Sequence, residues 1–350
     1  MTFKQYSTIN TDNSIWWFAF GYFACYAPYS ALTKALSDGL LPGMEAKIAG
    51  FQLLPITAVA SLISMFVFIT AMKWWKFATH RNVFGINFPS PTKWTLLSGL
   101  CTAAIIPTTT LAYTFGGVSI VFMMLLMRGG VLVIAPVVDF VSGRKVRWFS
   151  WMALLLALSA LFVGFSGKSF EITLIAAIDV SIYLAAYFVR LRFMSRLAKS
   201  DDKNARTRYF VEEQMVATPA LFLMLLIFAF LGGGAGAEAT RAGFTTFVTS
   251  GTMVVSIAFL VGIFSQGTGV FGGLILLDKR ENTFCVPVNR ASSVLAGIVA
   301  TICLWGFAGK KFPATSEFVG AILIIGAILV LSAPTLLKKR TERKVLVENV

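Results

Sequence analysis

This sequence contains the stretch MRGGVLVIAPVVDFVSGRK at residues 127–145 and a related stretch, NRASSVLAGIVATICLWGFAGKK, at residues 289–311. Each places an arginine beside small residues, continues through apolar residues, and ends in a glycine followed by two basic residues. The glycine follows the arginine by 15 residues in the first stretch and by 19 in the second, so a gap of about one helical turn aligns them. We interpret the two stretches as copies of one repeated element; the alternative is a chance similarity between two glycine-containing apolar helices.

The composition places both copies in a membrane protein. Of the 350 residues, 57% are hydrophobic and 13% are charged, and the mean hydropathy is +0.78. A soluble domain is about half apolar and about a quarter charged, and a disordered chain is poorer still in apolar residues. The remaining class is a polytopic membrane protein, in which spans of about 20 residues are helical.

Apolar runs of suitable length for such spans occur along the whole chain. We place them at about 14–37, 45–72, 93–115, 117–140, 148–166, 171–194, 209–231, 248–277, 281–307 and 314–337. Gly116-Gly117 predicts a tight turn between the third and fourth runs, and the charged residues Asp278 to Glu281 separate the eighth from the ninth. The expected fold is therefore an all-α bundle of ten transmembrane helices.

The basic residues indicate an orientation for this bundle. With a cytoplasmic N-terminus, the cytoplasmic segments carry 22 lysines and arginines, including the cluster from Arg190 to Arg208 and the basic tail Lys338–Lys344. The opposite side carries five, which are Lys47, Lys168, Arg241, Lys310 and Lys311. This bias follows the positive-inside rule, predicts that both termini are cytoplasmic, and explains most of the +14 net charge without a nucleic-acid partner. The rule holds in bacterial plasma membranes and eukaryotic organelles alike, and we favour the bacterial membrane.

The repeat divides the chain into two halves of five spans each, residues 1–166 and 167–350. An odd number of spans makes the second half enter the membrane from the opposite side. This inverted-topology repeat is typical of secondary transporters, which bind substrate near the midplane where the halves meet.

This architecture of five plus five inverted spans with cytoplasmic termini resembles the drug/metabolite transporter superfamily. That superfamily includes EamA-type exporters, nucleotide-sugar transporters and sugar-phosphate translocators. The stretch Val286-Pro287-Val288-Asn289-Arg290 is similar to the Gly-Ala-Leu-Asn-Lys motif with which the nucleotide-sugar branch contacts its nucleotide. Arg128 and Arg290 resemble the basic residues with which sugar-phosphate translocators hold phosphate. The resemblance therefore implies a ten-helix transporter fold and a polar substrate.

The start of the seventh span departs from the family. The family motif there is Phe-Tyr-Asn-Asn, whereas this chain has Phe210-Val211-Glu212-Glu213. Two carboxylates would repel a phosphate, so the resemblance supports transport more strongly than it supports a nucleotide sugar as substrate.

The two repeated arginines are the strongest candidate site residues. Arg128 is the twelfth residue of its run and lies about 18 Å from either end of a helix of that length. A cation at that depth costs roughly 3 kcal/mol and should face the bundle interior or a water-filled cavity. Arg290 takes the matching place in the second copy. We expect both to bind a carboxylate or phosphate group in one shared cavity, together with Asn289, Tyr183 and Tyr187; the alternative is that each arginine forms a structural ion pair.

Three acidic residues are candidates for coupling or for balancing these cations. Asp179 lies on the same helical face as Tyr183 and Tyr187 and could pair with an arginine or carry a proton. Glu212 and Glu213 lie at the start of the seventh span, where a helix N-terminus also favours carboxylates without any other role. Asp139 should form a local ion pair with Arg144, and Lys34 with Asp38.

Other kinds of site have little support. The four cysteines, at positions 25, 101, 285 and 303, lack metal-ligand spacing, and His80 is the only histidine. We therefore expect no metal, no cofactor and no enzymatic activity.

The favoured function is a secondary transporter of a small anionic or zwitterionic metabolite. One alternative is an EamA-like exporter of amino acids or amphipathic and cationic compounds, with Asp179 or Glu213 as the cation or proton site. An alternative of another class is a membrane-embedded lipid-handling or structural protein. The substrate and the membrane lipids are the expected partners.

Overall fold

The computed structural model describes residues 14–42, 44, 47–83, 86–111, 120–163, 174–199, 202, 204–249, 251–309, 312, 315, 318–320, 322–323 and 325–331. The predicted Gly116-Gly117 turn, Lys168, Lys310, Lys311 and the basic tail lie outside these residues.

The described chain is a bundle of α-helices with one small hairpin. The helices are α1 (Ser14–Ser37), α2 (Gly50–Ala71), α3 (Lys93–Leu111), α4 (Ile120–Val141), α5 (Trp148–Val163), α6 (Leu174–Phe193), α7 (Ala205–Leu231), α8 (Gly234–Thr245), α9 (Thr252–Leu276) and α10 (Asn282–Ala308). Short helical turns are η1 (Trp74–Phe77), η2 (Met194–Ala198) and η3 (Phe247–Thr249), and the strands are β1 (His80–Val83) and β2 (Ile86–Pro89). Further helical residues lie within Phe318–Leu331.

The predicted all-α class is confirmed, and helical residues lie in every predicted apolar run. In the part of the chain that the structure describes, four helices are long and apolar enough to cross a membrane, namely α2, α7, α9 and α10. Two shorter apolar helices occur at Trp148–Ala160 and Phe318–Leu331. The chain is thus compatible with an integral membrane protein, and the ten-span repeat stays a prediction.

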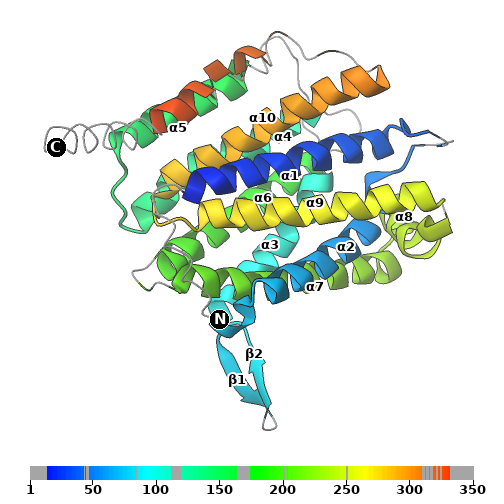
Figure 1. The fold of residues 1–350 in the computed structure, drawn as a ribbon, viewed down its shortest axis with the longest axis horizontal. Helices are drawn as coiled ribbons and strands as arrows, with labels where there is room; N and C mark the ends of the chain where they lie inside the picture. The colour runs from blue at the N-terminus through cyan, green and yellow to red at the C-terminus, as the bar shows by residue number, and fades with distance from the viewer. Residues whose placement is uncertain are drawn as a thin grey trace, which may run out of the picture.

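The long helices lie side by side along the long axis of the molecule (Figure 1). Helix α1 packs against α9 and α10, α3 packs against α6 and α7, and α2 packs against α8 and α9. The prolines at positions 28, 55, 107, 136, 219 and 287 all lie inside helices. A bundle accommodates such prolines because neighbouring helices compensate for the lost backbone hydrogen bonds.

Glycines allow two of these helix pairs to approach closely. A Cβ added at Gly130 in α4 would lie 2.6 Å from a methyl carbon of Leu184 in α6. A Cβ added at Gly262 in α9 would lie 2.5 Å from the carbonyl oxygen of Thr57 in α2. The Thr57 oxygen belongs to the backbone, so glycine sets the distance between α2 and α9, whereas a side chain at position 130 would require the Leu184 side chain to shift.

Two elements were not predicted, because both lie in stretches that appear in the sequence as polar breaks. Helix α8 occupies the break at 232–243, and its Gly243 packs on the backbone of Gln52 and the ring of Pro55 at the start of α2. Strands β1 and β2 occupy the break at 73–92 and pair antiparallel, with Arg81 opposite Phe88. Neither segment is apolar enough to be recognised from hydropathy.

Contacts between helix termini define one end of the bundle, which we call the polar end. Here the end of α4 meets the start of α10 through Asp139 and Asn282, and the start of α1 meets α10 through Trp16 and Phe284. The start of α7 meets the end of α9, where Arg206 donates to the carbonyl of Leu274. The connections between α4 and α5 and between α9 and α10 therefore lie together at this end.

The α2–α9 contact gives a test of the packing. We expect Gly262→Ala to lower the free energy of unfolding by about 1–3 kcal/mol, because the added methyl meets the rigid backbone of Thr57. Gly297→Ala in α10 is the matched control, since a Cβ there would meet nothing within 4 Å. Thermal unfolding of the purified protein should show a lower midpoint for Gly262→Ala alone. Equal midpoints for the two variants would contradict the described packing.

Candidate functional site

A central cavity of about 150 Å³ lies between the helices, and all five residues predicted to bind substrate line it. They come from three helices: Arg128 from α4, Tyr183 and Tyr187 from α6, and Asn289 and Arg290 from α10. The wall also carries polar residues outside the predicted binding set, namely Tyr22, Tyr26, Tyr29, Ser61, Thr102, Thr109, Arg190, Gln214, Ser265, Gln266 and Thr268. None of the described residues that line the cavity is an aspartate or glutamate. The described part of the lining therefore presents guanidinium, phenol, amide and hydroxyl groups but no carboxylate.

Arg290 is a buried residue of this cavity wall with two donor atoms that no described residue accepts from. Its side chain is 7% exposed, and its guanidinium lies 4.9 Å from the ring centroid of Tyr187. Its Nε and Nη2 atoms are buried and have no hydrogen-bond partner among the described residues, and no carboxylate there forms an ion pair with it. A buried guanidinium with donors left unused is costly to the folded state.

Arg128 lies on the same wall but has a protein partner. Its Nη2 donates a hydrogen bond of 2.7 Å to the hydroxyl of Tyr26, and its guanidinium lies 5.5 Å from the centroid of that ring. The phenol orients the arginine without neutralising it. The two arginines predicted to share a cavity therefore do so, one of them oriented by α1 and the other with unused donors.

The predicted neighbours of Arg290 shape its surroundings. The rings of Tyr183 and Tyr187 lie 4.8 Å apart, as their spacing of one helical turn predicts. Asn289 donates from Nδ2 to the carbonyl of Gly272 at 3.5 Å, which joins α10 to α9 beside the cavity. Rings and amides so placed give a bound molecule both apolar faces and hydrogen-bonding groups.

Arg190 lies in helix α6 and not in the cytoplasmic loop to which the sequence assigns it. The sequence pattern places it among the cytoplasmic loop cations, but it is 6% exposed and lines the cavity. Its Nε and Nη2 donate to the two carboxylate oxygens of Glu213 at 2.8 and 2.9 Å. Ser98 and Thr102 also donate to Glu213, at 2.7 and 3.1 Å. Glu213 is 0% exposed and its charge balances that of Arg190, and because α7 begins at Ala205, neither Glu212 nor Glu213 lies in its first turn.

Glu212 has a different role from its neighbour. One oxygen accepts from the backbone N and the hydroxyl of Thr79 at 2.9 and 2.7 Å. The other accepts from the backbone N of Thr92 and the hydroxyl of Thr95 at 3.2 and 2.7 Å. It is 1% exposed and does not line the cavity. Glu212 thus holds the two ends of the segment between α2 and α3.

Asp179 stays apart from the cavity. It is buried in α6, and its Oδ2 has no hydrogen-bond partner in the described part of the chain. It does not belong to the cavity wall, although Tyr183 and Tyr187 on the same helix do. Asp179 is therefore no counter-charge for Arg290 in this conformation.

The predicted ion pair between Asp139 and Arg144 is wrong, because the Asp139 carboxylate instead binds the start of α10. Its Oδ1 accepts from the backbone N and Nδ2 of Asn282 at 2.9 and 2.8 Å. Its Oδ2 accepts from the backbone N and Oγ1 of Thr283, both at 2.7 Å. The carboxylate of α4 thus caps the first turn of α10, where the helix dipole also favours a negative charge. The predicted pair of Lys34 and Asp38 is confirmed at 3.2 Å.

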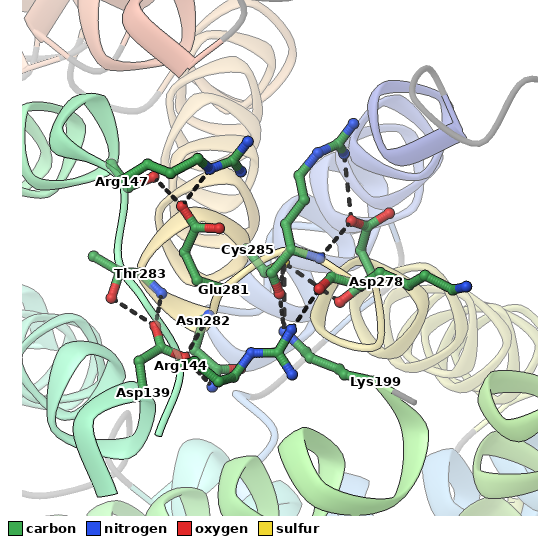
Figure 2. A network of polar contacts seen from close by, with 12 residues as sticks. Asp139, Arg144, Arg147, Lys199, Asp278, Glu281, Asn282, Thr283 and Cys285 are labelled. Atoms are coloured by element: carbon green, nitrogen blue, oxygen red, sulfur yellow. Dashed lines mark hydrogen bonds and ion pairs between the residues drawn. The ribbon is translucent and has the colours of Figure 1, made fainter. Parts of the chain in front are cut away.

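Figure 2 shows Asp139 as part of a larger network at the polar end. Arg147 and Ser150 donate to Glu281 at 2.8 and 2.6 Å, while Lys199 donates to the carbonyl of Arg280 at 2.7 Å. Arg144 donates to the carbonyl of Lys279. These bonds join α4, α5 and the segment after α6 to the connection between α9 and α10, and so they fasten the bundle together at this end.

No metal site is present among the described residues, where no three histidine, cysteine, aspartate or glutamate side chains gather. The four cysteines are free thiols.

Comparisons with known proteins support the fold only. No protein-family model matches the chain, and no curated protein sequence matches it. A solved structure described as "Crystal structure of protein" is similar, with a TM-score of 0.52 at 16% sequence identity. The match covers 94% of this chain and 99% of that chain. At this identity the likeness shows a shared fold and says nothing of activity.

The Arg190–Glu213 pair gives a test of the buried charges. We expect Glu213→Gln and Arg190→Met each to lower the free energy of unfolding by about 3–5 kcal/mol, because each leaves one buried charge without its partner. The double substitution should be less destabilised than the sum of the two, and thermal unfolding of all three variants measures this. Additive losses would show that the two side chains do not interact.

Glu281 gives a test that depends on pH. Burial raises the pKa of its carboxyl, but hydrogen bonds from Arg147 and Ser150 lower it by more, so that pKa lies below the ordinary value of 4.5. A lowered pKa stabilises the fold at neutral pH, and this contribution disappears as the pH falls through the pKa of the folded protein. We therefore expect Glu281→Gln to lower the unfolding midpoint at pH 7, and the gap to wild type to narrow below about pH 4.5. A gap that is constant with pH would contradict this.

Proposed function

We propose that the protein is a secondary transporter of the drug/metabolite type, which moves a small anionic or zwitterionic metabolite through the central cavity. In this proposal ten helices cross the membrane as two inverted halves, with both termini in the cytoplasm, and the favoured membrane is a bacterial plasma membrane. The halves rock around a site near the midplane to give alternating access. The protein acts as no enzyme and needs no cofactor or nucleic acid.

The single observation that carries the proposal is the state of Arg290. Its buried Nε and Nη2 have no hydrogen-bond partner among the described residues, and the cavity wall described there has no carboxylate. A guanidinium binds carboxylate or phosphate through two parallel hydrogen bonds, and Nε with Nη2 offers one such pair of donors. The substrate therefore supplies the missing negative charge, and Arg128 lies on the same wall to contribute a second cationic group.

The contacts at the polar end fit alternating access. Asp139, Arg147 and Ser150 belong to the proposed first half, whereas Glu281, Asn282 and Thr283 belong to the second. The bonds between them join the proposed halves at the polar end. In an alternating-access cycle these bonds would break when that end opens and form again when it closes.

Asp179 supports a second candidate, an EamA-like exporter of amino acids or cationic compounds. Its buried Oδ2 without a partner is an acceptor for an ammonium group or a proton. Glu213 is less suited to this task, because Arg190 already occupies both of its oxygens. A zwitterion that bridges the cavity and Asp179 after a conformational change would combine both candidates.

The test is ligand-dependent thermal unfolding of the purified protein. The panel holds sugar phosphates, nucleotide sugars, carboxylates, amino acids and organic cations. A ligand at 100 times its Kd adds about 2.7 kcal/mol to the free energy of unfolding. We expect an anion or zwitterion to raise the midpoint of wild type, and Arg290→Met to abolish that rise. Arg192→Gln, on α6 but outside the cavity wall, is the control and should keep it.

The midpoint without ligand separates a binding role from a structural one. Replacing a buried charge that has no partner by an apolar side chain should leave the ligand-free midpoint of Arg290→Met unchanged or higher. A structural ion pair would instead make that midpoint fall. The proposal fails if only cations stabilise the protein, or if an anion still stabilises Arg290→Met.

A further inference from the structure

The β1–β2 hairpin leaves the bundle beside the start of α3 and runs across the direction of the long helices (Figure 1). It follows α2, one of the helices long and apolar enough to cross a membrane, and it precedes α3. An element that leaves the end of a spanning helix sideways runs along the membrane surface rather than through it. If α2 crosses a membrane, as proposed above, this direction puts the hairpin at the level of the lipid headgroups.

The base of the hairpin is fixed by a buried charge. Glu212 of α7 accepts hydrogen bonds from Thr79, just before β1, and from Thr92, just after β2. The backbone N of Ser90 donates to the carbonyl of Thr79 at 2.7 Å and closes the base. Because a buried carboxylate holds both legs, the direction of the hairpin is set by the bundle.

The two faces of the hairpin differ in chemistry. Successive residues of a strand point to opposite faces, so the register puts the exposed Arg81 and Phe88 on one face and the exposed Asn82 and Asn87 on the other. Phe88 is 51% exposed. A two-stranded hairpin is marginally stable in water alone, so a surface that receives the face of Phe88 would stabilise it.

The basic and aromatic residues around the hairpin indicate which kind of surface would receive this face. Residues 72–94 contain Lys73, Lys76, Arg81 and Lys93 and no acidic residue. The same segment carries Trp74, Trp75 and Trp94, and Trp94 is 56% exposed. Tryptophan is enriched at membrane–water interfaces, and clustered basic residues beside a span are attracted to anionic lipids.

We propose that the β1–β2 hairpin is an interfacial anchor that lies on an anionic lipid surface with the face of Phe88 toward the acyl chains. Arg81 and the neighbouring lysines contact the lipid phosphates, while Asn82 and Asn87 face water. The Glu212 clamp transmits this attachment to α7, whose next residue, Glu213, holds Arg190 at the cavity wall. Anionic lipid thereby holds the helices around the cavity in place.

The test measures the depth of two neighbouring positions. Phe88→Cys and Asn87→Cys are made separately in a background in which Cys25, Cys101 and Cys303 are Ser and Cys285 is Ala. Each variant is spin-labelled and placed in phosphatidylcholine vesicles with or without phosphatidylglycerol. The ratio of accessibility to oxygen over a water-soluble nickel complex should be several-fold higher at position 88 than at 87. Phosphatidylglycerol should increase this difference, and Arg81→Gln should reduce it.

Two results would overturn the proposal. Equal, high access of the nickel complex to both labels would place the hairpin in water. Low access of both reagents to both labels, independent of phosphatidylglycerol, would indicate a protein partner or a second copy. In the unlabelled chain with its native cysteines, phosphatidylglycerol should raise the unfolding midpoint more for wild type than for Arg81→Gln. Equal rises there would also contradict the proposal.

Discussion

The arrangement of this bundle depends on one constraint, namely that a charge buried among apolar helices needs a compensating group. Arg190 meets the constraint with Glu213, and Asp139 meets it with the first turn of α10. Arg290 alone among these keeps buried donors without acceptors in the described chain. Asp179 and Arg206 also keep one buried polar atom each without a partner among the described residues, and costs of this kind gather at functional sites.

Sequence reasoning predicted the helices and the cavity wall because both depend on local patterns. The depth of Arg128 and Arg290 within apolar runs, and the one-turn spacing of Tyr183 and Tyr187, direct these side chains to the interior. The partners of the acidic residues could not be predicted in the same way. Asp139 binds Asn282 and Thr283, which follow it by 143 and 144 positions in the chain. Glu212 binds threonines that precede it by more than 110 positions. Such pairings are decided by tertiary packing, for which the sequence carries no local signal.

Arg190 and the two glutamates show how this limit misplaced residues. Arg190 lies beside a run of loop cations and has no feature in the sequence that separates it from them. Glu212 and Glu213 are adjacent, yet successive helical residues point about 100° apart, so one holds the loop base and the other holds Arg190. The partner of Arg190, Glu213, lies 23 positions further along the chain, so no local pattern indicated that Arg190 is buried. The hairpin and α8 were missed because their sequences are polar.

The claim that Arg290 awaits a negative charge from the substrate is tested most directly by transport itself. The measurement is counterflow of a radiolabelled anion into proteoliposomes preloaded with the same unlabelled anion, for wild type, Arg290→Lys and Arg290→Met. The account predicts uptake by wild type, weaker uptake by Arg290→Lys, which keeps the charge but loses the two-pronged donor, and none by Arg290→Met. Uptake by Arg290→Met at the wild-type rate would contradict it.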